Sequence, residues 1–200
     1  MKNTALILLL LLLSYNSFSQ QEADGFSLEI KLNPELAYVN LAFMEPSFKG
    51  TLSGGVNVEK GINQYLKVGV GLQFKNRGVQ YELDETDYQG DIIGKRKIKE
   101  RVNYLSAPLF IKGKLNNFYG TLGISLDIFL TSSNGYFLWE ENIRKVNSSF
   151  YTAIGYHLNL KEQLFLNMEA SFNPMIFSIT NNDGPHAYNF GLGFGLGFRL

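Results

Sequence analysis

The segment YNFGLGFGLGFRL, residues 188–200, decides the fold class of this chain. Large apolar residues occupy every second position, and glycine or a polar residue fills the positions between them. Successive side chains of a β-strand point to opposite faces, so this strand has one wholly apolar face and one face of glycines. A soluble sandwich would bury the apolar face. A membrane barrel would turn it to lipid and let the glycines line a narrow lumen.

The same period of two recurs along the rest of the chain. In one of these segments the apolar phase changes near Arg77 and Gly78, to Val79 and Tyr81, and we expect a β-bulge there. Each alternating stretch has about ten residues, the length that a tilted strand needs to cross a bilayer. The chain therefore predicts an all-β fold, an eight-stranded antiparallel up-and-down transmembrane β-barrel. The seven further segments are roughly 26–33, 52–59, 66–83, 105–114, 121–128, 154–160 and 164–173.

The connections between these segments alternate in length. Bacterial outer-membrane barrels have short periplasmic turns and longer extracellular loops, and this pattern predicts the same arrangement here. The short connections are 61–64, 116–117 and 161–163, and the long ones are roughly 42–50, 84–97, 131–146 and 179–187.

The position of the charged residues indicates which face of the barrel is inside. Acids and bases fall on the faces opposite to the apolar residues, and buried charges require partners, so we expect ion pairs that fill the lumen rather than an open pore. A soluble lipid-binding barrel would show the reverse, with an apolar interior and a polar exterior. The predicted lumen ion-pair cluster is Glu29, Lys31, Glu59, Lys67, Lys75, Lys112, Lys114, Asp127 and Glu169, and Asn57, Gln73 and His157 share that face.

The N-terminus has the features of a secretory signal. Lys2 precedes an unbroken apolar run over residues 6–13, which is too short to span a bilayer, and small residues precede a cleavage point after Ser19. We therefore expect residues 1–19 to be a signal peptide and residues 20–200 to be an outer-membrane β-barrel domain. The predicted location is the bacterial outer membrane.

Composition excludes several classes of function. The 18 basic and 18 acidic residues balance, which argues against a nucleic-acid partner. The chain has no cysteine, so disulfides, thiolate zinc sites and a cysteine nucleophile are excluded. We expect no cofactor and no metal, and an acidic cluster at residues 84–91 matches no calcium-binding loop, so a solvated loop is expected there.

Aromatic residues near the predicted strand ends are candidates for interfacial girdles. A group in the third long loop, including Leu138, is equally compatible with a partner contact, because exposed apolar patches often mark such sites. The candidate girdle residues are Tyr65, Tyr104, Phe118, Tyr136, Phe137, Trp139, Phe150 and Tyr188.

Three segments carry a family resemblance: YLKVGVGLQFKNRG at 65–78, VNYLSAPLFIK at 102–112 and FGLGFGLGFRL at 190–200. They resemble the PorT-like outer-membrane β-barrel family of Bacteroidota-type bacteria, and the resemblance covers essentially the whole mature chain. It implies insertion by the barrel-assembly machinery, and a few members are implied in protein secretion and gliding. None of the matching positions is a known catalytic residue of the family. The family usually ends in an aromatic residue, whereas this chain ends in Leu200.

A basic run lies where the second long loop meets its strand. At that height it would lie among anionic lipopolysaccharide head groups, so we weigh contact with lipopolysaccharide and outer-membrane lipid against a plain solvated loop base. The run is Lys95, Arg96, Lys97, Lys99 and Arg101.

These observations predict a non-enzymatic integral barrel. Its extracellular loops would bind a partner or a surface molecule, or assist secretion together with an envelope partner protein. One alternative is an outer-membrane hydrolase or acyltransferase at the rim, with Ser178, Asp183 and His186 brought together. The other is the soluble periplasmic lipid-binding barrel described above.

Overall fold

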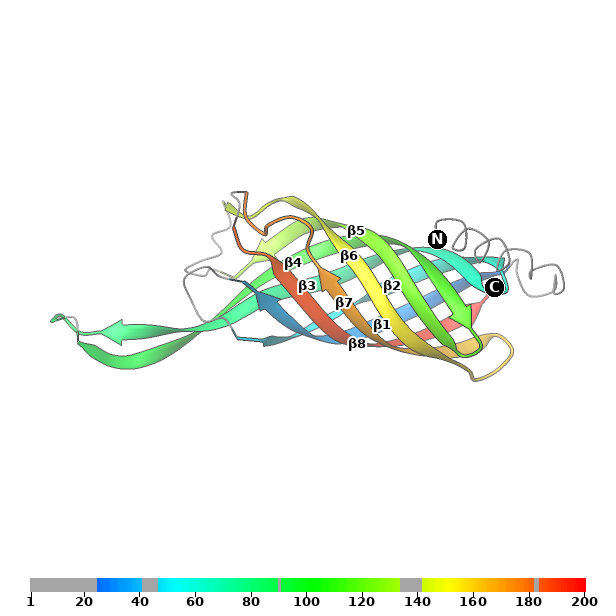
Figure 1. The fold of residues 1–200 in the computed structure, drawn as a ribbon, viewed down its shortest axis with the longest axis horizontal. Coiled ribbons are helices and arrows are strands. Elements are labelled where there is room, and N and C mark those ends of the chain that lie inside the picture. The colour runs from blue at the N-terminus through cyan, green and yellow to red at the C-terminus, as the bar shows by residue number, and fades with distance from the viewer. Residues whose placement is uncertain (1–24, 41–46, 90, 134–141, 182–183) are drawn as a thin grey trace, which may run out of the picture.

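The computed structural model describes residues 25–40, 47–89, 91–133, 142–181 and 184–200. Within these residues, eight antiparallel strands pair in sequence order, and β1 pairs with β8 to close the barrel (Figure 1). The predicted fold class is confirmed. The strands are β1 (Phe26–Val39), β2 (Lys49–Asn63), β3 (Leu66–Thr86), β4 (Ile92–Leu115), β5 (Phe118–Ser132), β6 (Val146–Asn159), β7 (Leu164–Pro174) and β8 (Ala187–Arg199).

The alternation in the sequence becomes an alternation in burial. On β1 the apolar Ile30 is 63% exposed, whereas its neighbours Glu29 and Lys31 are almost completely buried. The apolar residues therefore form the outer face and the ionic residues line the lumen, as predicted. This arrangement contradicts the soluble lipid-binding barrel, which requires an apolar interior.

The glycines of β8 make room for neighbouring side chains inside this narrow lumen. A Cβ at Gly195 would lie 2.0 Å from a carboxylate oxygen of Glu29. A Cβ at Gly197 would lie 2.1 Å from the ring of Phe165. The glycine face is therefore a consequence of crowding in an eight-stranded barrel.

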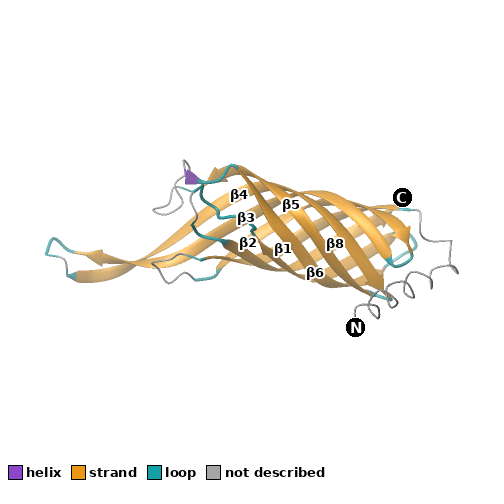
Figure 2. Cartoon of the chain, turned by 45° about the horizontal axis from the view of Figure 1, so that its top comes forward, coloured by secondary structure: helices purple, strands orange, loops and turns teal. Residues whose placement is uncertain are grey.

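The second long connection differs from its prediction as a loop over 84–97. β3 and β4 have 21 and 24 residues, against 11 to 15 for the other strands, so β3 continues to Thr86 and β4 already begins at Ile92. The two strands leave the barrel together as a long ribbon, which Figures 1 and 2 show from two directions. The ladder continues because opposite charges face each other, with Glu82 across from Lys97 and Asp84 across from Lys95.

The predicted β-bulge at Arg77 and Gly78 is wrong. The register of β3 with β4 is unbroken from Leu66 to Glu85, so Val79 and Tyr81 stay on the inward face. At this height the interior of the barrel changes from polar to apolar, while the alternation of inward and outward residues along β3 continues unchanged. Most inward residues above this height form an apolar cluster, here called the upper core: Val39, Val79, Tyr81, Val102, Tyr104, Ile143, Met175, Ile179 and Ala187. One acid, Glu100, is also completely buried there and accepts a hydrogen bond from the hydroxyl of Tyr81.

Tyr104 is therefore not a girdle residue, because it is completely buried in the upper core. At the long-loop rim the outer aromatic contacts are Tyr38–Phe48, with ring centroids 5.3 Å apart, and Phe172–Phe190, 4.7 Å apart. Tyr188 joins them. Phe118, Tyr65 and Phe150 also lie on the outer surface, and Phe118 stacks edge-on with Tyr156 at the other rim. Tyr136, Phe137, Leu138 and Trp139 lie outside the described residues, as does the predicted signal peptide, 1–19.

The three short connections lie together at the rim where β1 begins and β8 ends. In the turn between β4 and β5, Asn116 has a φ of 55°, a left-handed conformation that asparagine tolerates better than most residues. No helix among the described residues is long and apolar enough to span a bilayer.

Candidate functional site

The lower part of the lumen is filled by lysines that bridge acids from different strands. Lys112 pairs with Glu59 and lies 4.0 Å from a carboxylate oxygen of Glu29. Lys67 lies 3.6 Å from Glu59 on the other side. These contacts join β1, β2, β3 and β4 across the interior.

A second ion pair crosses the lumen from β1 to β7. Lys31 pairs with Glu169, whose other oxygen accepts a hydrogen bond from Tyr119 at 3.1 Å. Asn167 and Asn57 donate to the two oxygens of Glu29, at 2.7 and 3.2 Å. These buried carboxylates are thus held by both charge and hydrogen bonds, which buried charges require.

The upper part of the lumen centres on Asp127. Arg77 lies 3.4 Å and Lys75 3.9 Å from its oxygens, and the hydroxyls of Ser106 and Ser149 donate to it at 2.5 and 2.8 Å. Arg77 is completely buried and also donates to the backbone oxygen of Asn173 at 2.9 Å. Sequence reasoning missed Arg77 because the expected bulge took it out of the inward phase. An uninterrupted alternation along β3, in which every odd-numbered residue points inward, would have placed Arg77 in the lumen.

The lumen thus joins eight of the nine predicted residues through direct ion pairs, and it adds Arg77. Lys114 is half-buried near the turn that leads to β5. His157 is hydrogen-bonded to Asn167 at 2.8 Å and to Asn159 at 2.9 Å. Every ionic group at the centre faces another side chain closely, so this network holds strands together and leaves little room for a substrate.

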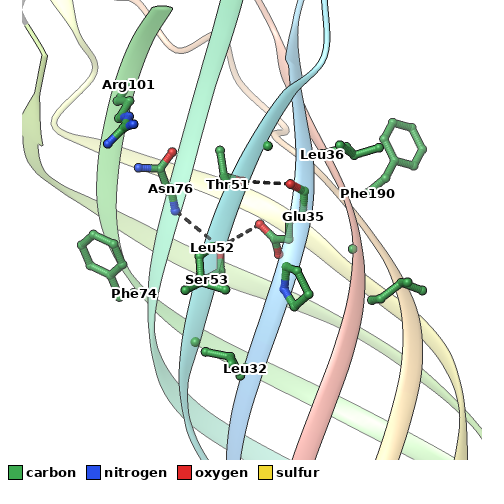
Figure 3. A pocket seen from close by; sticks show the side chains of 15 residues that line it. Leu32, Glu35, Leu36, Thr51, Leu52, Ser53, Phe74, Asn76, Arg101 and Phe190 are labelled. Atoms are coloured by element: carbon green, nitrogen blue, oxygen red, sulfur yellow. Dashed lines mark hydrogen bonds between the residues drawn. The ribbon is translucent and has the colours of Figure 1, made fainter.

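A groove lies on the outer face of the barrel, where β2 and β3 separate. Their ladder ends at Gly54 and Phe74 and resumes only at an isolated bridge between Ser47 and Gln80. Between these points Ser53 spans the gap inside the wall, accepting from the backbone of Asn76 at 3.4 Å (Figure 3). The groove has a volume of about 1120 Å³, and Arg101 lies above it. Glu35, Thr51, Ser53 and Gly191 contribute to its lining, and Glu35 is a buried acid that accepts a hydrogen bond from Ser53 at 2.7 Å. The rest of the lining consists of outer-face residues of four strands: Leu32, Pro34, Leu36, Gly50, Leu52, Gly54, Phe74, Asn76, Phe190 and Leu192.

A family model described as Outer membrane protein beta-barrel domain matches residues 5–198. The chain belongs to this family. A similar solved structure is the outer membrane protein OprG of Pseudomonas aeruginosa, with 11% identity, 89% of this chain and 97% of that chain covered, and a TM-score of 0.51. Neisserial surface protein A has 11% identity, coverage of 88% and 97%, and a TM-score of 0.46. At such identities the likeness to OprG shows the fold alone. The comparison with curated proteins found no match to the sequence.

Membership in this family gives the barrel its orientation, because outer-membrane barrels have short turns in the periplasm and longer connections outside. The ribbon of β3 and β4 therefore stands on the extracellular side. The predicted basic run lies on this ribbon. Lys95, Lys97, Lys99 and Arg101 follow one another on its outward-facing positions, in line with the lipid-facing residues of β4, and Arg96 lies on the opposite face.

The described rim residues of the alternative hydrolase make hydrogen bonds to the backbone of their own loop and of its neighbour. The Ser178 hydroxyl donates to the backbone oxygen of Pro185 at 3.2 Å and accepts from the Gly184 backbone at the same distance, so it stabilises its own loop. The backbone oxygen of His186 accepts from Asn40 at 3.0 Å. Asp183 lies outside the described residues.

The acidic residues of the ribbon tip also serve the turn. Asp87 accepts hydrogen bonds from the backbones of Gln89 and Asp91, at 2.8 and 3.0 Å. Across the described ranges, no three His, Asp or Glu side chains gather in a way that could hold a metal ion.

Proposed function

We propose that this outer-membrane barrel is a non-enzymatic binding protein, and that the tip of the β3–β4 ribbon is the surface that contacts a partner protein outside the cell. The observation that carries the proposal is the exposure of three apolar side chains at the tip. Tyr88 is fully exposed, and Ile92 and Ile93 are 64% and 67% exposed. Contiguous exposed apolar side chains mark interaction sites when lipid does not cover them.

The ribbon holds this apolar tip away from the membrane. Most other exposed apolar residues in the described part of the chain lie on the barrel wall, where lipid covers them, but the tip lies beyond the end of the wall (Figure 1). The stalk below it is rich in charge, with Glu82 and Asp84 facing Lys97 and Lys95. A polar stalk with an apolar end is suited to presenting one contact surface at a distance.

An accessory role in protein secretion is the finer form of this proposal. The resemblance to PorT-like barrels supports it, since a few members of that family are implied in secretion. A secretion partner in the envelope would be the protein bound by the tip. Insertion by the barrel-assembly machinery belongs to the same proposal.

Site-specific photocrosslinking in living cells tests the proposed tip. A photoreactive residue at Tyr88 or Ile93 is expected to capture one discrete partner protein. The matched control is the same residue at Leu122, which is 61% exposed on the barrel wall and faces lipid. In a second experiment the photoreactive residue is placed at Gln89, beside the apolar side chains. The triple change Tyr88→Ser, Ile92→Ser and Ile93→Ser is then expected to abolish capture of the partner and to leave the heat-modifiable gel mobility of the barrel unchanged. Equal capture at Leu122, or capture that survives the triple change, contradicts the proposal.

A further inference from the structure

The outward face of β3 and β4 changes its chemistry in steps as it rises from the barrel wall into the ribbon. The lowest step is apolar and the next is a pair of amides, in which Asn76 donates to Asn103 at 2.6 Å. Each step is one cross-strand pair of residues. Above the amides, two pairs contain a base but no acid, and the next two pairs contain a base that faces an acid. From the wall upward, the cross-strand pairs are Phe74–Leu105, Asn76–Asn103, Gly78–Arg101, Gln80–Lys99, Glu82–Lys97 and Asp84–Lys95.

Two bases in this series lack a local counter-charge. Lys97 and Lys95 face Glu82 and Asp84, whereas Arg101 faces a glycine and Lys99 faces a glutamine. Arg101 and Lys99 are exposed and form no salt bridge with any described residue. The uncompensated positive charge is therefore concentrated at the base of the ribbon, beside the membrane surface.

The groove described above lies directly below Arg101, which contributes to its lining, and Lys99 lies two residues further out along the ribbon. The groove is hollow at its centre because the outer faces of β2 and β1 carry the small residues Gly50, Gly54 and Pro34 there. Leu36 and Phe190 stand on one side of it and Phe74 on the other (Figure 3). A Cβ at Gly50 would meet nothing within 4 Å, so this position is open space. The volume of about 1120 Å³ is slightly above the range of small-molecule sites, which is roughly 300–1,000 Å³.

We propose that this groove, with Arg101 and Lys99 above it, is a binding site for a phosphorylated, acylated glycolipid of the outer leaflet. One acyl chain lies along the apolar groove, and a head-group phosphate contacts the guanidinium of Arg101 and the ammonium of Lys99. A guanidinium binds phosphate through two parallel hydrogen bonds, which makes arginine the more selective of the two contacts. This proposal is independent of the partner contact at the ribbon tip.

The order of the steps favours a lipid over a soluble anion. Apolar, amide and cationic residues follow one another along the membrane normal, as do the acyl chains, linkages and phosphates of a glycolipid. The groove also opens on the extracellular half of the wall, where the outer leaflet is made of such glycolipids. A soluble anion would use the two bases and leave the groove without a role.

A second groove in the wall supplies an internal comparison. It has a volume of about 620 Å³ and is lined by Gly113, Gly120, Ile154 and Phe172 among others, with no charged residue in its lining. A Cβ at Gly120 would also meet nothing within 4 Å. The two grooves thus share an apolar wall with open glycines, but only the first lies below cations.

The test is lipid binding by the full barrel in detergent, measured by native mass spectrometry with bis-phosphorylated lipid A as the probe. The double change Arg101→Gln and Lys99→Gln is expected to weaken binding by about tenfold or more, because charge-assisted hydrogen bonds are lost. The matched control, Lys95→Gln with Lys97→Gln, removes the same charge from the two acid-paired steps and is expected to leave affinity unchanged. Gly50→Leu is expected to weaken binding by filling the groove, and Gly120→Leu to leave it unchanged.

Three competing ligands complete the test. Lipid A without phosphates, phosphatidylglycerol and inorganic phosphate are each expected to bind at least tenfold more weakly than the probe. Equal binding of dephosphorylated lipid A would remove the role of the bases, equal binding of phosphatidylglycerol would make the site a general anionic-lipid surface, and displacement of the probe by inorganic phosphate would make it a soluble-anion site. Each of these results, or unchanged binding in both the arginine–lysine and Gly50→Leu variants, overturns the proposal.

Discussion

The barrel has two interiors of opposite polarity, one above the other. In the membrane-spanning part, ion pairs such as Lys31–Glu169 fill the inside and apolar side chains cover the outside. Above it, the inside is the upper core, in which Tyr81, Tyr104 and Ile179 are buried together. The same strands run through both parts without a change of phase.

The medium outside the barrel explains this inversion. In lipid, the outer face must be apolar and polar groups must be satisfied internally, so the ionic side chains turn inward. In water, burial of apolar area stabilises the fold, so the apolar side chains turn inward. The side-chain pattern of β3 therefore reads Gln73, Lys75, Arg77 and then Val79, Tyr81 on a single face.

The largest effect is expected from Asp127→Ala in the membrane-spanning interior. The change leaves Arg77 and Lys75 buried without their counter-ion, and breaking a buried pair in this way costs about 3–5 kcal/mol. Urea unfolding of the barrel in lipid vesicles measures the free energy of unfolding. The control is Asp84→Ala on the exposed ribbon, with an expected change below about 0.5 kcal/mol. Equal effects of the two changes would contradict the ionic role of Asp127.

An intermediate and localised effect is expected from Ile179→Ala in the upper core. Ile179 is completely buried, and removing a buried isoleucine side chain costs about 2–5 kcal/mol where the surroundings cannot collapse. Amide hydrogen exchange is expected to rise at Val79 and Val102 while the β7–β8 ladder in the membrane stays protected. Exchange that rises equally in both parts would show that the two interiors are not separate.

The smallest effect is expected from Lys97→Gln on the ribbon. Lys97 faces Glu82 across the ladder at an exposed position, and such cross-strand charge pairs contribute roughly 0.2–1 kcal/mol. Thermal unfolding with and without 0.5 M salt checks this, since salt screens exposed pairs and is expected to remove most of the difference. An effect as large as that of Ile179→Ala would place Lys97 in a packed environment.

Most of the membrane-spanning part could be predicted from the sequence, because lipid imposes a strict alternation on each strand. Glu29, Lys31 and Asp127 are recognisable as lumen residues from the strand in which they stand. Their partners are not, since Glu169 and Lys31 are 138 residues apart and meet only through the register of the closed barrel.

The part above the membrane was harder to predict for a physical reason. Around Val79 the residues still alternate with a period of two, but apolar side chains now occupy the positions that are polar lower in the strand. A β-bulge and a change from lipid to water outside the barrel both produce this pattern in a single strand. The charged residues of the ribbon predict a loop, because such residues are frequent both in loops and in exposed strands. The groove could not be predicted because its position depends on where β2 separates from β3, and the sequence of neither strand alone indicates that point.

The separation of β2 from β3 also determines how the ribbon transmits force. Above Phe74, β3 loses its ladder with β2, whereas β4 remains joined to β5 up to Val102, and Ser133 still donates to the backbone of Arg101 at 2.9 Å. The ribbon is thus joined to the barrel by a continuous ladder along its β4 edge, whereas its β3 edge is held only by the bridge between Ser47 and Gln80 among the described residues. A load applied at its tip therefore passes mainly into the β4–β5 side of the wall.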